Sequence, residues 1–154
     1  MKKLLVIILF FITTSLFAAS KKNLDSAYKN IKKNSDNCTN INKEFLNKTT
    51  GDKKKFTDFS DLEQKVYIIM NIHTMIHELK EIQEKWQAHM EDLPKTSEDE
   101  DEVKKSDLKE YINKLSDMQT QYATKLKELI KDLFKQYPDK FTEEEIEYYL
   151  RLSQ

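Results

Sequence analysis

The sequence predicts an all-α fold, an elongated helical bundle of three long helices plus one short C-terminal helix. The chain of 154 residues holds only one glycine, Gly51, and two prolines, Pro94 and Pro138, whereas average usage would give roughly ten and eight. A sheet protein needs many turn residues, so their scarcity favours helices. Apolar residues also recur every three or four positions through most of the chain, which places them along one side of a helix.

The first twenty residues, MKKLLVIILFFITTSLFAAS, have the three parts of a secretory signal peptide. Two lysines precede a mainly apolar stretch from Leu4 to Phe17, and small residues follow at positions 18–20. The apolar stretch is short for a membrane-spanning helix. We therefore expect residues 1–19 to be a signal peptide and the mature protein to be soluble, and either periplasmic or secreted. A retained membrane anchor is the alternative.

The remainder, residues 20–154, is long enough for one domain with a hydrophobic core and short for two. Its charge is uneven. Residues 20–57 carry ten Lys and four acidic residues, or +6, whereas residues 58–154 carry fourteen Lys or Arg and twenty-three acidic residues, or −9. We expect the basic first segment to be attracted to the acidic remainder within a single helical-bundle domain.

The first helix is predicted from about Asn23 to Lys48. Its apolar positions recur at helical spacing: Leu24, Ala27, Tyr28, Ile31, Cys38, Ile41, Phe45 and Leu46. The stretch KNSDNCTN in its middle is poor in helix-forming residues, because Ser, Asp and Asn side chains compete for backbone hydrogen bonds. A break near residues 34–37 is therefore the alternative. Gly51 ends the helix, and residues 49–58 are predicted to form a loop.

The second helix is predicted to begin at Ser60 and to continue until Pro94. Ser60 and Glu63 have the spacing of a capping box, in which each side chain bonds the backbone N–H of the other residue. Asp58 is the competing cap. The apolar positions continue the helical spacing: Leu62, Val66, Ile69, Ile72, Ile76, Leu79, Trp86 and Met90.

The third helix is predicted to be capped by Thr96 or Ser97 and to end at Pro138. The acidic run 98–102 then lies in its first turn, where the helix dipole favours negative charge. A calcium loop would alternate its ligands and contain a glycine, and this run does neither. The apolar positions have a mean spacing near 3.6, typical of a fairly straight helix: Leu108, Tyr111, Leu115, Met118, Tyr122, Leu126, Leu129, Leu133 and Tyr137.

The phrase FTEEEIEYYLRL predicts a short last helix, Glu143–Leu152. Thr142 and Glu145 have capping-box spacing, and Phe141 is placed to pack against Ile146 as a hydrophobic staple. We expect three apolar residues on one side of this helix: Ile146, Tyr149 and Leu150.

His73 and His77, one turn apart on the second helix, are the candidate metal ligands. An i, i+4 pair of histidines can bind one zinc or copper ion. Thr74 stands where a zinc protease has its catalytic Glu, so protease chemistry is not predicted. Glu81 lies too far along the helix from His73, and His89 too far from His77, to complete a site on this helix alone. Their place at the border of the apolar stripe favours packing residues, with metal ligation as the alternative.

Cys38 is the only cysteine, so no internal disulfide is predicted. Its position on the apolar side of the first helix favours a small buried side chain. A disulfide to another chain is the alternative, because an unpaired cysteine in an oxidising compartment can pair between molecules.

The sequence holds no phosphate-binding glycine loop and no recognisable nucleophile motif. We therefore expect a protein that is not an enzyme, needs no cofactor and acts by binding another protein through a helix face or the cradle between helices. Export argues against nucleic acid as a partner. The basic stretch 21–33 makes contact with an anionic membrane surface an alternative.

Overall fold

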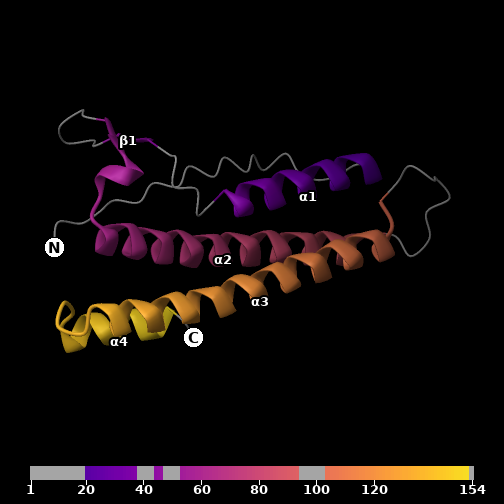
Figure 1. Ribbon diagram of the computed structural model, residues 1–154. Helices are drawn as coiled ribbons and strands as arrows, with labels where there is room; N and C mark the ends of the chain where they lie inside the picture. Colours follow the sequence, from indigo (N-terminus) through magenta and orange to yellow (C-terminus); the bar gives the residue numbers. More distant parts are fainter. Residues whose placement is uncertain (1–19, 38–43, 47–52, 94–102, 153–154) are drawn as a thin grey trace.

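The computed structural model describes residues 20–37, 44–46, 53–93 and 103–152 (Figure 1). Four α-helices make up most of this part of the chain: α1 (Lys21–Asp36), α2 (Asp61–Asp92), α3 (Lys105–Gln136) and α4 (Glu143–Leu152). The predicted all-α bundle with a short C-terminal helix is confirmed. None of the helices in the described ranges combines the length and the apolar character that crossing a bilayer requires.

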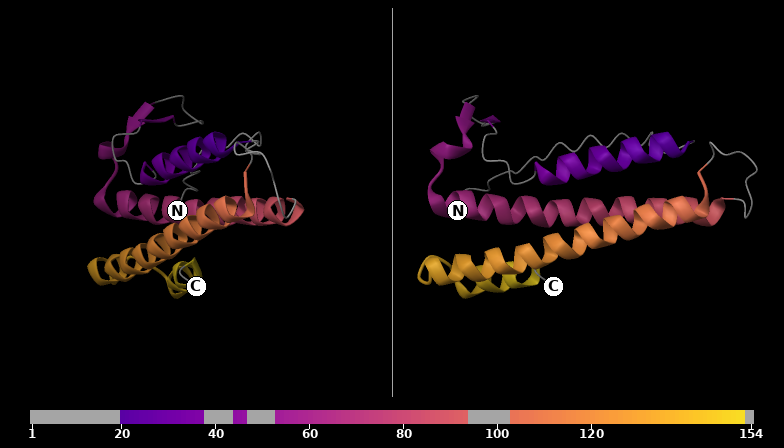
Figure 2. Two further views of the ribbon diagram at one scale, coloured as in Figure 1. Left: turned by 90° about the vertical axis from the view of Figure 1, so that its right-hand side faces the viewer. Right: turned by 45° about the vertical axis from the view of Figure 1, so that its right-hand side comes forward.

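The long helices α2 and α3 form an antiparallel hairpin that runs the length of the molecule (Figure 1 and Figure 2). α1 lies against one side of this hairpin, beside the C-terminal half of α2 and the N-terminal half of α3, and runs parallel to α3. α4 folds back along the C-terminal part of α3 on the other side. The hairpin is therefore the frame to which the two shorter helices are attached.

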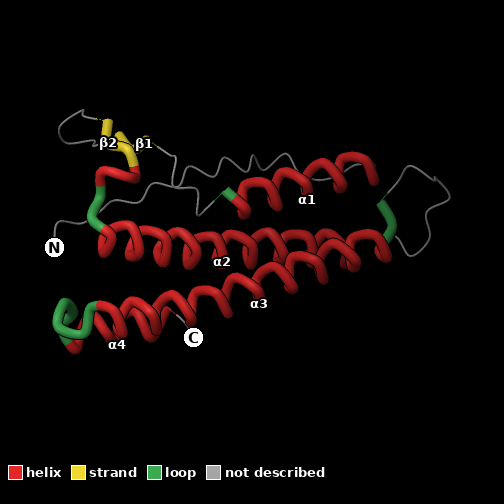
Figure 3. Tube along the Cα trace, in the orientation of Figure 1, coloured by secondary structure: helices red, strands yellow, loops and turns green. Residues whose placement is uncertain are grey.

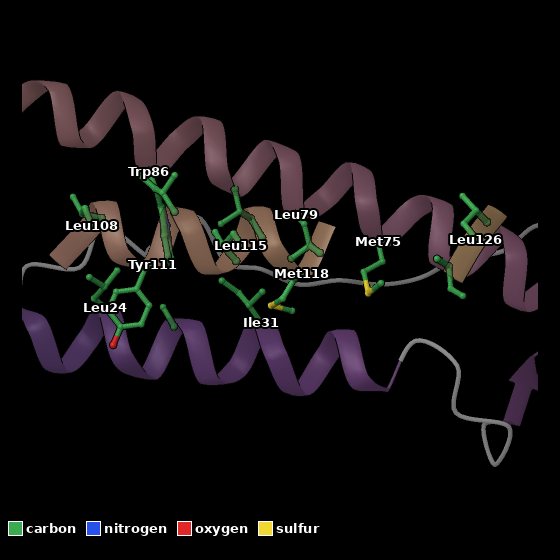
Figure 4. Close-up of a cluster of buried hydrophobic side chains, with 14 of the residues drawn as sticks. Leu24, Ile31, Met75, Leu79, Trp86, Leu108, Tyr111, Leu115, Met118 and Leu126 are labelled. Carbon is green, nitrogen blue, oxygen red and sulfur yellow. The ribbon is translucent and has the colours of Figure 1, made fainter. Parts of the chain in front are cut away.

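Side chains of α1, α2 and α3 meet in one hydrophobic core (Figure 4). Trp86 of α2 packs edge-on against Tyr111 of α3, with ring centroids 6.4 Å apart. Burying a Leu or Ile side chain contributes about 1.5–3 kcal/mol, so this core is the main source of stability. The largest fully buried aliphatic side chains and methionine of the three helices are Leu24, Ile69, Ile72, Met75, Leu79, Leu108, Leu115, Leu126, Ile130 and Leu133.

Polar contacts along the hairpin fix how α2 and α3 align. Gln119 donates from Nε2 to Oε1 of Gln83 over 2.6 Å, and the Tyr137 hydroxyl donates to the carboxylate of Asp61 near the other end. The Tyr137 bond, followed by the ammonium of Lys65, lowers the pKa of Asp61. The later residue of α2, Gln83, meets the earlier residue of α3, and Asp61 at the start of α2 meets Tyr137 at the end of α3, as an antiparallel pair requires.

The capping box predicted at the start of α2 is confirmed. The Glu63 amide donates to Ser60 Oγ over 3.3 Å, and the Ser60 amide donates to Glu63 Oε2 over 2.9 Å. These bonds satisfy two amides that have no partner within the helix.

The predicted extent of the first helix is wrong. α1 ends at Asp36, at the predicted break and well before Lys48. Strand β1 (Glu44–Leu46) follows instead and pairs antiparallel with β2 (Lys53–Lys55), with Glu44 opposite Lys55. A short 3-10 helix η1 (Phe56–Asp58) leads into α2 (Figure 3), so part of the predicted 49–58 loop is ordered structure.

The predicted cap of the third helix is also wrong. α3 begins at Lys105, with Lys104 as the N-cap residue. The Asp107 side chain accepts from the Lys104 amide over 3.3 Å. This bond caps the start of the helix, a role that the sequence predicted for Thr96 or Ser97. The acidic run 98–102 lies outside the described residues.

The last helix has the predicted bounds, and its capping box is confirmed. The Thr142 amide donates to Glu145 Oε2 over 2.9 Å, and the Glu145 amide donates to Thr142 Oγ1 over 3.2 Å. Phe141 and Tyr149 pack with Phe134 of α3 in an aromatic cluster, with ring centroids between 5.4 and 6.0 Å apart. This cluster attaches α4 to the hairpin.

Candidate functional site

A row of polar contacts joins α1 to α3, and each contact spans 86 residues. Lys21 pairs with Asp107 over 3.0 Å, the Tyr111 hydroxyl donates to Asp25, and the Tyr122 hydroxyl donates to Asp36 over 3.4 Å. The constant spacing shows that the two helices run parallel in register. The Lys21 pair is one instance of the expected attraction between the basic first segment and the acidic remainder.

Tyr111 is at the centre of the α1–α3 contact. Its hydrogen bond to the Asp25 carboxylate, together with burial, raises the pKa of Tyr111 to about 12. The Lys114 ammonium lies 4.4 Å from the centroid of the Tyr111 ring and 5.6 Å from that of Tyr28, positions suited to cation–π attraction. The Tyr111–Asp25 bond and the Lys114–Tyr28 contact therefore hold α1 against α3.

His73 and His77 lie side by side on α2. Their ring centroids are 4.8 Å apart and their ring planes are 17° from parallel. His73 is partly buried and His77 is exposed. Burial of His73 and the nearby charge of His77 lower the pKa of His73. The pair therefore places a partly buried imidazole, whose neutral form burial favours, beside an exposed one.

His89 does not join this pair, as its spacing along the helix predicts. His89 is partly buried and lies twelve residues beyond His77 on the same helix, which corresponds to about 18 Å along its axis. Among the described residues, no group of three or more His, Cys, Asp or Glu side chains is placed to hold one metal ion. Cys38 lies outside the described residues.

Glu78 is a partly buried carboxyl group that sequence reasoning missed. It follows the buried Met75 by three residues and precedes the buried Ile82 by four, so it lies beside the buried side of α2. Its Oε2 atom is buried and has no hydrogen-bond partner within the described part of the chain. Burial, followed by the charge of Glu81, raises the pKa of Glu78 to about 7.

The surface of α4 carries exposed apolar side chains. Of the residues that the structure describes, only Tyr148 and Leu150 are large apolar residues classed as exposed, at 43% and 48%. Because successive helix residues lie about 100° apart, these two fall on either side of the buried Tyr149. The sequence placed Leu150 on the same side of the helix as Ile146 and Tyr149, yet Leu150 is exposed whereas Tyr149 is buried.

The outward face of α4 between Tyr148 and Leu150 is acidic. Glu143, Glu144 and Glu147 are exposed there beside a single cation, Arg151. The helix thus presents a negative ridge with an apolar residue at each border. Comparison of the chain with protein-family models, curated proteins and solved structures found no match.

Proposed function

We propose that the protein is exported and acts by binding another protein rather than by catalysis. The observation that carries this proposal is the surface of α4, where Tyr148 and Leu150 border the acidic ridge of Glu143, Glu144 and Glu147. A few residues supply most of the binding energy at protein interfaces, with tyrosine prominent among them, and surrounding charges select the partner.

The partner that fits α4 is a protein surface with basic residues between two apolar pockets. The negative ridge would attract such a surface during encounter. An anionic membrane is the less favoured partner of this helix, because its own charge would be repelled. The helix axis is held by the Phe134, Phe141 and Tyr149 cluster, so the binding residues project from a fixed support.

Replacing both exposed apolar residues, as Tyr148→Ser/Leu150→Ser, is expected to reduce capture of the native partner at least tenfold. Truncating a hot-spot residue of an interface costs about 2 kcal/mol or more. The measurement is crosslinking and pull-down from the envelope and extracellular fractions of the native host, with wild-type protein beside the variant. Circular dichroism should show equal helix content, because neither residue is buried.

A matched control is Lys125→Ser/Glu128→Ser, which alters two exposed residues of α3. This variant should capture the partner as the wild type does. Equal capture by the α4 variant and the control would contradict binding through α4. A partner held by α4 should also be released by added salt, which screens the charges of the ridge.

Export is tested separately through the N-terminus of the protein made by its native host. The order of charged, apolar and small residues in positions 1–20 leads us to expect a mature chain that begins between Ala19 and Lys21. N-terminal sequencing of protein from the soluble extracytoplasmic fraction measures this directly. Recovery of chains that still begin with Met1 would contradict it.

A further inference from the structure

We propose that His73 and His77 form a two-ligand site for a late first-row divalent cation, namely Cu²⁺, Ni²⁺ or Zn²⁺. These ions accept neutral imidazole nitrogen as a ligand. The site lies on α2 and uses none of the α4 residues that support the proposed function. Either proposal can therefore fail without the other.

The geometry of the pair is close to that of a chelate. Two nitrogens bound about 2.1 Å from one ion lie roughly 3–3.4 Å apart, whereas the ring centroids of His73 and His77 are 4.8 Å apart in nearly parallel planes. A small tilt of each ring brings the nitrogens together. The outer torsion of histidine is broad, so this tilt has little energetic cost.

An ion can reach the pair from solvent. A neutral imidazole offers a metal the lone pair of one ring nitrogen. His77 is exposed, which gives an ion a path from solvent.

The support beneath the pair is rigid. Ile72 and Met75, on the same turns of α2, are fully buried in the core. The hydroxyl of Thr74, between the two histidines, donates to the Met70 carbonyl over 3.0 Å and is turned to the backbone. Both imidazoles are thus held one turn apart before an ion arrives, which limits the entropy lost on binding.

The coordination that this arrangement provides is open. Within the described residues no third His, Cys, Asp or Glu joins the pair, so water fills the remaining positions on the ion. Thr74 stands where a zinc protease has its catalytic Glu, so the pair lacks the general base of that motif. The site is therefore suited to reversible binding of the ion.

Isothermal titration calorimetry tests the site. The purified protein, without a histidine tag, is titrated with Ni²⁺, Cu²⁺ and Zn²⁺ salts. We expect one equivalent of ion per chain for at least one of these cations, with an affinity at least tenfold higher than that of His77→Ala. His77 is exposed, so this variant should fold normally, as circular dichroism can verify. His73→Ala should show the same loss.

The matched control is His89→Ala, which removes a histidine from the same helix and should bind as the wild type does. Lowering the pH from 7.5 to 5.5 should weaken binding, because protons compete for the imidazoles. Failure of all three ions to bind would overturn the site, as would binding that His73→Ala/His77→Ala retains.

Discussion

Replacing Leu115 by aspartate is expected to lower the free energy of unfolding by about 4 kcal/mol or more. Leu115 is fully buried in α3, and Figure 4 shows it among the core side chains of all three packed helices. An aspartate there would place an unpaired carboxylate in an apolar core and remove the packing of the leucine. Urea unfolding followed by circular dichroism measures the change.

The matched control for this variant is Ser116→Asp. It adds the same charge at the next position of α3, which is exposed. Surface substitutions of this kind usually change stability by less than about 0.5 kcal/mol. If Leu115→Asp unfolded at the same urea concentration as Ser116→Asp, α3 would not face the core as described.

Replacing Glu78 by glutamine is expected to stabilise the protein by about 1–2 kcal/mol at pH 8 and to have little effect at pH 4. The folded state raises the pKa of this carboxyl from 4.5 to about 7, so folding disfavours its charged form. By linkage, a pKa shift of this size would lower the free energy of unfolding by about 3.4 kcal/mol. The expected effect is smaller because the side chain is only partly buried. Unfolding of both proteins at the two pH values measures the difference.

The sign of this pH dependence follows from the two pKa values. Above about pH 7 the carboxylate is charged in both states and the full penalty is present, whereas below about pH 4.5 it is neutral in both and the penalty is absent. The contribution of Glu78 to stability therefore falls as the pH rises from 4.5 to 7. Glu84→Gln, at an exposed position of α2, is the control and should lack this change. A benefit of Glu78→Gln that is equal at pH 4 and pH 8 would contradict the assignment.

The helices whose ends carry strong local signals were predicted most accurately. α4 has its predicted bounds because Thr142 and Glu145 close a capping box, and Pro138 stops the helix before it. α2 likewise begins after Ser60 and ends at Asp92, just before Pro94. In both cases the information lies within a few residues of the helix end, where sequence reasoning can find it.

The first helix was predicted too long because the prediction followed the spacing of the apolar residues alone. It therefore continued through residues that form helices poorly. Phe45 and Leu46 continue the apolar repeat, yet they belong to β1. Short apolar runs satisfy helix and strand patterns alike, and the pairing of β1 with β2 is a contact between segments that no local pattern reveals. The cap of α3 was missed for a similar reason, since Lys104 is not a preferred cap residue.

Some of the candidate sites can be predicted from the sequence and others cannot. The His73 and His77 pair follows from i, i+4 spacing alone, so it was found. Glu78 was missed because a charged residue beside an apolar stripe is usually solvated. Its burial depends on how the neighbouring side chains pack, which the sequence does not show. The exposure of Leu150 depends on how α4 is rotated against α3, which the aromatic cluster with Phe134 determines.

The chain connections affect the entropy of closing the fold. Docking α1 onto the formed hairpin closes the connection of 24 residues between Asp36 and Asp61, whereas the Lys105–Glu91 contact, at the end where α2 and α3 are connected, closes a loop of 14. The longer connection costs about 0.5 kcal/mol more to close. Loop entropy therefore favours release of α1 over opening of the α2–α3 hairpin, so the buried residues of α1 must supply the difference through packing.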